Sequence, residues 1–151
     1  MKSKTETLRL ILTGLLKPFE FAQFPPVRDD EPREADALWQ VGHAGYDAAR
    51  GLVSPFQGTG LETRFEDRFY GKRSREPWQG LRPEAQPVLV WWQELLSAAV
   101  HTLDTRELEQ ALPQPIAFTA FTVHSVGEAF DYVIYHSSFH LAVAQARLGF
   151  V

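Results

Sequence analysis

The chain has 151 residues, enough for one domain, and its 44% hydrophobic residues can form a single sizeable core. Its net charge is −4, and no Lys/Arg run is longer than the pair Lys72 and Arg73, so no basic face for nucleic acid is expected. The absence of cysteine excludes disulfides, thiolate metal sites and a catalytic thiol of the chain's own. His, Asp and Glu remain as the strong metal ligands, and we expect residues 1–151 to form one domain.

The first predicted element is an amphipathic helix that ends near Lys17 and Pro18, because proline lacks an amide donor. Its apolar residues recur at helical spacing: Leu8, Ile11, Leu12, Leu15, Leu16 and Phe19. Arg9 and Lys17 interrupt this run and no cleavage site follows promptly, which argues against a signal peptide. No stretch has the apolar length that crosses a bilayer, so we expect a cytoplasmic protein without a membrane partner.

A second helix is predicted from about Glu34, after the loop "QFPPVRDDEPRE", to a stop at "SPFQGTG". Residues 55–82 hold many of the glycines and prolines and predict a long surface connection, with a short helix in "LETRFEDRF". A connection of this length is often functional.

The third helix is predicted from about Pro83 to Leu103, with Pro87 in its first turn. Trp91 and Trp92 are adjacent and point to different faces, so one is expected in the core and the other at a dimer or cleft contact.

The spacing of Asp104 and Glu107 predicts a cap for a short helix over "TRELEQAL". The alternating segment "PQPIAFTAFTV" predicts extended structure, such as a short hairpin. Ser125 and Glu128 form a capping box for a last helix that reaches about Leu148, where Gly149 stops it. These elements predict an all-α fold: a four-helix bundle with a long crossover connection and a minor extended segment before the last helix.

Three histidines form the candidate metal site. His136 and His140 are four residues apart, so they project from one face of the last helix. His43 is the single histidine of the second helix. Three imidazoles from two facing helices supply three ligands and leave positions open for water or substrate, as in catalytic zinc sites. Ordinary interior histidines with other hydrogen-bond partners are the competing interpretation.

Spacing excludes two other metal centres. "HSSFH" lacks the glutamate of H-E-x-x-H, and the E-x-x-H pairs of di-iron bundles are absent, so a mononuclear site remains. His101 and His124 are expected at the surface or at a helix cap.

Asp47 is the candidate catalytic residue, because it lies one turn after His43. It is placed to accept a hydrogen bond from an imidazole or to act as a base near the metal, and the alternative is a carboxylate that faces solvent or pairs with Arg50. Tyrosines near the site are candidates for donation to substrate, with core-edge packing as the alternative: Tyr46, Tyr132 and Tyr135. Basic residues of the connection are candidates for binding an anionic cosubstrate, and the alternative is that they belong to a solvated loop: Arg64, Arg68, Lys72, Arg73 and Arg75.

The order "LWQVGHAGYD", a long crossover, "TLDTRELEQAL" and "TVHSVGEAFDYVIYHSSFHLAVAQARLG" resembles the DinB-like superfamily of damage-inducible and YfiT-type proteins over nearly the whole chain. The resemblance implies a four-helix bundle, commonly a homodimer, that holds a divalent metal such as zinc or nickel on three histidines, by position His43, His136 and His140. Many relatives continue the last histidine with x-G-Q, whereas Ala142 and Val143 stand here. No role of that glutamine transfers to this chain.

Characterised members of that superfamily include thiol-dependent S-transferases and isomerases that use mycothiol, bacillithiol or glutathione. The resemblance therefore implies a metal-dependent thiol transferase, or a related hydrolase or isomerase, with a low-molecular-weight thiol and a small electrophile as partners. A metal held by neutral imidazoles suits this chemistry, since it lowers the pKa of a bound water or thiol. The competing hypothesis is a non-catalytic stress-response protein whose histidines bind metal incidentally or stabilise a dimer.

Overall fold

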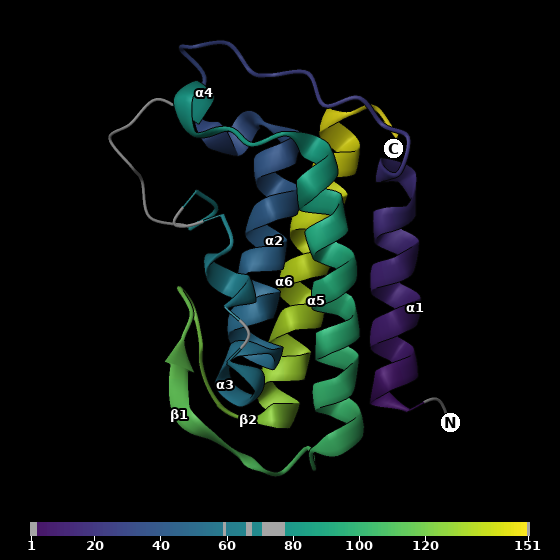
Figure 1. Cartoon of the computed structure of the whole chain (residues 1–151), viewed down its shortest axis with the longest axis vertical. Coiled ribbons are helices and arrows are strands. Elements are labelled where there is room, and N and C mark those ends of the chain that lie inside the picture. Colours follow the sequence, from purple (N-terminus) through teal and green to yellow (C-terminus); the bar gives the residue numbers. More distant parts are fainter. Residues whose placement is uncertain (1–2, 59, 66–67, 71–77, 151) are drawn as a thin grey trace.

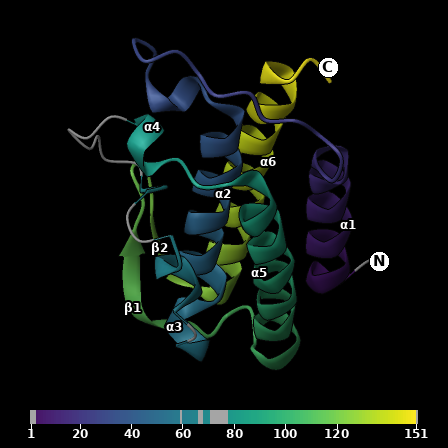
Figure 2. The same cartoon turned by 45° about the horizontal axis from the view of Figure 1, so that its top comes forward.

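The computed structural model describes residues 3–58, 60–65, 68–70 and 78–150, and it is mostly helical with one small sheet. Its long helices run alongside one another in both views (Figures 1 and 2): α1 (Lys4–Leu16), α2 (Ala37–Leu52), α5 (Ala85–Thr105) and α6 (Val126–Arg147). Helix α2 packs against α5 and α6, and α1 packs against the same two helices. The described helices include none that is both long and apolar enough to span a lipid bilayer.

Helix α1 confirms the predicted first helix. Ser3 and Glu6 form a capping box at its start, and Leu8, Leu12 and Leu16 are buried along one face. A 3-10 turn, Lys17–Phe19, follows directly and contains Pro18.

Helix α2 begins three residues later than predicted. Residues Arg33–Ala35 form a separate 3-10 turn, and Asp36 caps α2 by accepting a hydrogen bond from the Leu38 amide at 2.9 Å. Nearly every residue of α2 is buried, because α5, α6 and the connection that follows it surround it.

The connection after α2 contains more helix than predicted. "SPFQ", expected to be a helix stop, forms the one-turn helix α3 (Ser54–Gln57), and Gly58 ends it in the left-handed conformation with φ 57°. Within the predicted short helix, a 3-10 turn covers Leu61–Thr63. A further one-turn helix that the sequence did not predict, α4 (Trp78–Leu81), precedes α5.

The prediction of a separate short helix over "TRELEQAL" is wrong. Helix α5 continues to Thr105, so Asp104 lies inside it and accepts a hydrogen bond from Thr5 Oγ at 2.8 Å instead of capping a new helix. Strand β1 (Ala111–Ala117) follows and pairs antiparallel with β2 (Thr122–Ser125), which confirms the predicted hairpin. The pairing is irregular between Ala111 and Ile116, where two prolines lack the amide hydrogen that a strand donates: Pro113 and Pro115.

Ser125 caps α6 by accepting from the Glu128 amide at 3.1 Å. Glu128 reaches one residue beyond the cap, to the His124 amide, so the expected capping box is shifted by one residue. Gly149 follows the C-cap residue Leu148 and has φ 79°, which agrees with its predicted role in ending the helix.

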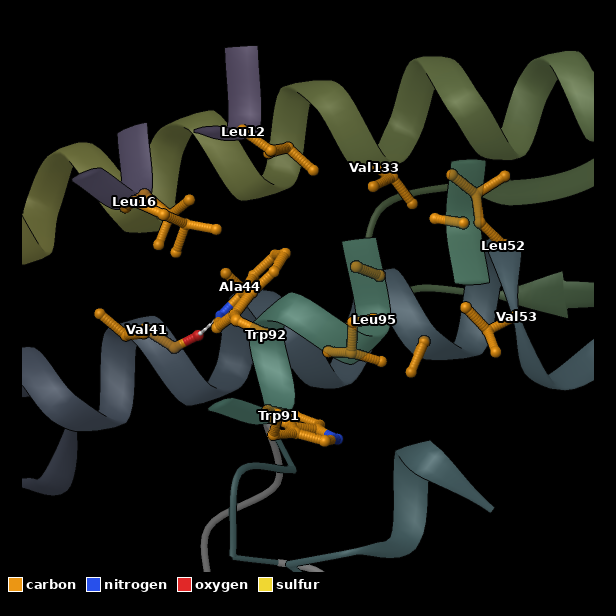
Figure 3. Close-up of a cluster of buried hydrophobic side chains, with 14 of the residues drawn as sticks. Leu12, Leu16, Val41, Ala44, Leu52, Val53, Trp91, Trp92, Leu95 and Val133 are labelled. Carbon is orange, nitrogen blue, oxygen red and sulfur yellow. Dashed lines mark hydrogen bonds between the residues drawn. The ribbon is translucent and has the colours of Figure 1, made fainter. Parts of the chain in front are cut away.

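The core lies between the long helices (Figure 3), and both tryptophans of α5 belong to it. Trp91 and Trp92 are each 1% exposed, so the expectation that one of them forms a dimer or cleft contact is wrong. The Trp92 indole donates to Val41 O in α2, and the Trp91 indole donates to Leu61 O in the connection. Helix α5 is thus covered on two sides, which accounts for the burial of both rings.

Candidate metal centre

The three candidate ligands meet between α2 and α6. The ring centroids of His43, His136 and His140 are 4.4 to 4.9 Å apart, and one nitrogen of each ring lies within 4.8 Å of the other two. Three nitrogens around a tetrahedral zinc would be about 3.4 Å apart, so a small inward movement of the rings would bring the nitrogens to ligating positions. Within the described part of the chain, the residues that could hold a metal are the three that the sequence singled out.

Hydrogen bonds orient two of these rings. His43 Nδ1 donates to the carbonyl of Phe69 at 2.8 Å, and His140 Nδ1 donates to Gln40 Oε1 at 2.6 Å. The Gln40 amide nitrogen in turn donates to Glu34 O, which fixes the amide orientation. Because each Nδ1 carries the hydrogen, Nε2 of His43 and of His140 keeps a lone pair for a metal.

The third ring contains an orphaned nitrogen. His136 Nε2 lies 3.3 Å from Asp47 Oδ2, whereas its Nδ1 is buried and has no hydrogen-bond partner among the described residues. A buried polar atom without a partner is unfavourable, and ligation of a metal is one way to satisfy it. This orphaned nitrogen, together with the two oriented rings, shows that the donor set fits a metal ion.

No family model, curated protein or solved structure matches the chain. What the site does therefore has to be inferred from its own side chains.

Burial keeps the histidine pair of α6 neutral. Loss of solvation and the neighbouring histidines lower the pKa of His136 to about 3 and that of His140 to about 4. Metal ligation requires an unprotonated nitrogen, so both rings are in the ligating state at neutral pH.

Three further groups shape the site and were missed from the sequence. Gln40 lies one turn before His43 on the same helical face, a spacing that could have identified it. Trp39 stacks on His43 with ring centroids 4.6 Å apart and an interplanar angle of 8°. Phe69 contributes a backbone carbonyl, for which no side-chain pattern exists.

Asp47 both contacts an imidazole and pairs with Arg50, two roles that the sequence had left as alternatives. It is buried, and its carboxylate contacts His136 through one oxygen and Arg50 through the other, at 3.3 Å each. Tyr132 also donates to it at 3.3 Å. Burial raises the pKa of Asp47, an effect that the positive charge of Arg50 opposes. The imidazole that it contacts is His136 rather than His43, its neighbour in the chain.

A cavity of about 540 Å³ opens beside His43. Its described lining comes from α2, the connection and the hairpin: His43, Asp47, Arg50, Tyr70, Ala117, Phe118 and Thr119. A small molecule in this cavity would touch one of the candidate ligands and Asp47 together.

The remaining candidates lie away from this cavity or outside the described residues. His101 and His124 are exposed, and so is Tyr135. Arg64 pairs with Glu94, and Arg68 accepts through its carbonyl from Arg33. Three basic residues of the connection fall outside the described residues: Lys72, Arg73 and Arg75.

Gly42→Ala is expected to destabilise the protein by about 1–3 kcal/mol, because a Cβ at this position would lie 2.2 Å from the Phe69 ring. That ring is 1% exposed and packs against Trp91 and Trp78, so it has little room to move. Urea unfolding measures the change. Gly14→Ala is the matched control, since its Cβ meets nothing within 4 Å and an alanine there should be neutral or stabilising. Equal effects of the two substitutions would contradict this packing.

The metal-free protein is expected to lose stability as pH falls from 7 to 5. The unfolded chain binds protons on His136 and His140 near pH 6.5, whereas the folded chain does not until the pH approaches their lowered pKa values. The loss is up to about 2 kcal/mol per histidine at pH 5. Urea unfolding at both pH values measures it, and the raised pKa of Asp47 works in the opposite direction. The pH dependence should shrink in His136→Gln/His140→Gln and persist in His101→Gln; an unchanged dependence in the first variant contradicts the assignment.

Proposed function

We propose that the protein binds one divalent metal ion through His43, His136 and His140, and that the long helices form the four-helix bundle of DinB-like proteins with its long crossover. The observation that supports the metal is the convergence of three imidazoles, two of them oriented by Nδ1–H bonds and one with an orphaned nitrogen. A metal ion would satisfy this buried nitrogen, which has no other partner among the described residues.

Zinc or nickel is the proposed metal. The donors are imidazoles, which suit zinc, copper, iron and nickel, and the chain has no thiolate to offer. Three neutral donors leave the charge of a divalent ion uncompensated at the site.

The proposed activity is thiol-dependent S-transfer, or a related hydrolysis or isomerisation. A metal in this site supplies Lewis acidity, which lowers the pKa of a bound thiol or water. Asp47 lines the cavity and has a raised pKa, so its carboxylate is suited to take the proton that the thiol or water loses. Tyr132 and Arg50 hold that carboxylate in place. Phe118 and its neighbours Ala117 and Thr119 form the hairpin side of the cavity.

The test starts from protein made without a histidine tag. Metal analysis should find about one equivalent of zinc or nickel, and assays with small electrophiles should show turnover that depends on an added low-molecular-weight thiol. Asp47→Asn should reduce the rate while metal content stays the same. Stoichiometric metal without turnover for any thiol would favour the non-catalytic alternative.

The alternative, a dimeric interaction protein, has one specific observation in its favour. Three large aromatic side chains near the site are more than half exposed: Phe121, Tyr135 and Phe139. Phe121 and Tyr135 are in contact, and Phe139 packs on His140, so the rings extend from the hairpin along α6. Light scattering should show a dimer that Tyr135→Ser/Phe139→Ser weakens; a monomeric wild-type protein rejects this alternative.

A further inference from the structure

The wall of the site cavity contains a guanidinium group that is fixed in place. The Arg50 side chain is 24% exposed and donates to Asp47 Oδ1 and to the carbonyl of Ala117, at 3.3 Å each. Its guanidinium also lies 4.9 Å from the Phe118 ring centroid and 5.7 Å from that of Tyr46. A surface arginine would be free to rotate, whereas this one is held between α2 and the hairpin.

Most of its donors have no acceptor among the described residues. A guanidinium has five N–H donors, and within the described part of the chain two of them, both at 3.3 Å, have acceptors. Arginine in such a position favours planar anions, because its parallel N–H groups match the two oxygens of a carboxylate.

With a metal ion bound, the charges around the cavity would favour an anion. Among its described lining residues, the acidic Asp47 and the basic Arg50 offset each other. Glu62 lines an adjoining cavity together with Arg50. A divalent ion on three neutral donors would make the site positive, although the whole chain carries −4.

The guanidinium is close to the metal ligands. One carboxylate, that of Asp47, contacts Arg50 with one oxygen and His136 with the other. Arg50 and His43 both line the cavity, so a small molecule in it can reach both side chains.

We propose that Arg50 forms a carboxylate-binding subsite, and that the cosubstrate is a small thiol that carries a carboxylate. The carboxylate binds the guanidinium while the sulfur lies at the histidines. This inference rests on the proposed function for the position of the thiol, and on Arg50 and the cavity for the carboxylate.

The probes are 3-mercaptopropionate and its neutral analogue 2-mercaptoethanol, titrated into protein loaded with Co²⁺. The thiolate-to-cobalt absorption band reports binding. Wild-type protein should bind 3-mercaptopropionate about 10–100-fold more tightly, the range of a hydrogen bond to a charged group. Arg50→Gln should abolish the preference, Arg50→Lys should keep part of it, and Arg9→Gln, an exposed arginine of α1, should leave it unchanged.

Equal affinity for the two thiols in wild-type protein, or a preference that survives Arg50→Gln, overturns the subsite. Absence of bound cobalt overturns the proposed metal site instead, and the subsite is then tested without metal. Succinate should protect Arg50 from modification by phenylglyoxal, as mass spectrometry of the peptides measures, and should not protect Arg9. Arg50→Lys remains available if Arg50→Gln does not fold, because it keeps a positive charge beside Asp47.

Discussion

His140→Ala is expected to abolish stoichiometric metal binding. The ring contributes one of three donors, and its Nδ1–H bond to Gln40 at 2.6 Å shows that Nε2 is the nitrogen with the lone pair. Loss of a donor costs more than the 10–100-fold in affinity that loss of an outer hydrogen bond costs. Metal analysis of dialysed protein, and competition with a chromophoric chelator, measure the change.

Two further variants serve as comparisons for His140→Ala. Gln40→Leu removes the hydrogen bond that orients His140 and keeps all three donors, so it should weaken metal binding by about 10–100-fold without abolishing it. His124→Ala removes an exposed histidine and should have no effect. Unchanged metal content in His140→Ala would show that the ion, if present, lies elsewhere.

Asp36→Ala is expected to cause the largest loss of stability, about 3–5 kcal/mol, because it leaves a buried positive charge without its partner. The Asp36 carboxylate is fully buried and accepts from Arg82 Nε at 2.6 Å, the Trp78 indole at 2.8 Å and the Leu38 amide at 2.9 Å. Three segments, the start of α2, α4 and the approach to α5, meet on this side chain. Urea unfolding of protein at neutral pH measures the loss.

Asp36→Asn keeps the shape of the side chain and its cap on α2, and should recover part of the difference. Asp30→Ala is the surface control: Asp30 pairs with Arg28 at 3.3 Å, but both side chains are about three-quarters exposed. It should change the free energy of unfolding by less than about 0.5 kcal/mol. A similar loss for Asp36→Ala and Asp30→Ala would contradict a buried ion pair.

Local patterns were sufficient to predict the long helices and the histidine cluster. The spacing of His136 and His140 defines one face of a helix whatever surrounds it, and His43 is the single histidine of the helix that packs there. The hairpin was equally local, since alternation and β-branched residues predict strands over a short segment.

The predictions that were wrong concerned features that depend on contacts between distant segments of the chain. The capping pattern at Asp104 and Glu107 is favourable for a new helix, but Thr102 and Leu103 are buried and α5 continues past them. Trp91 and Trp92 are both buried, and their indoles donate to carbonyls that lie thirty or more residues earlier in the chain. No periodicity within one helix contains that information.

The hydrogen bond between His43 and the Phe69 carbonyl makes the connection between α2 and α5 sensitive to occupancy of the site. Any ligand that restrains the His43 ring also restrains the backbone at Phe69, and by reciprocity a connection held in this conformation favours the ligand. Amide hydrogen exchange at residues 61–65 and 68–70 should therefore slow when metal is added, which would make this connection a reporter of the occupied site.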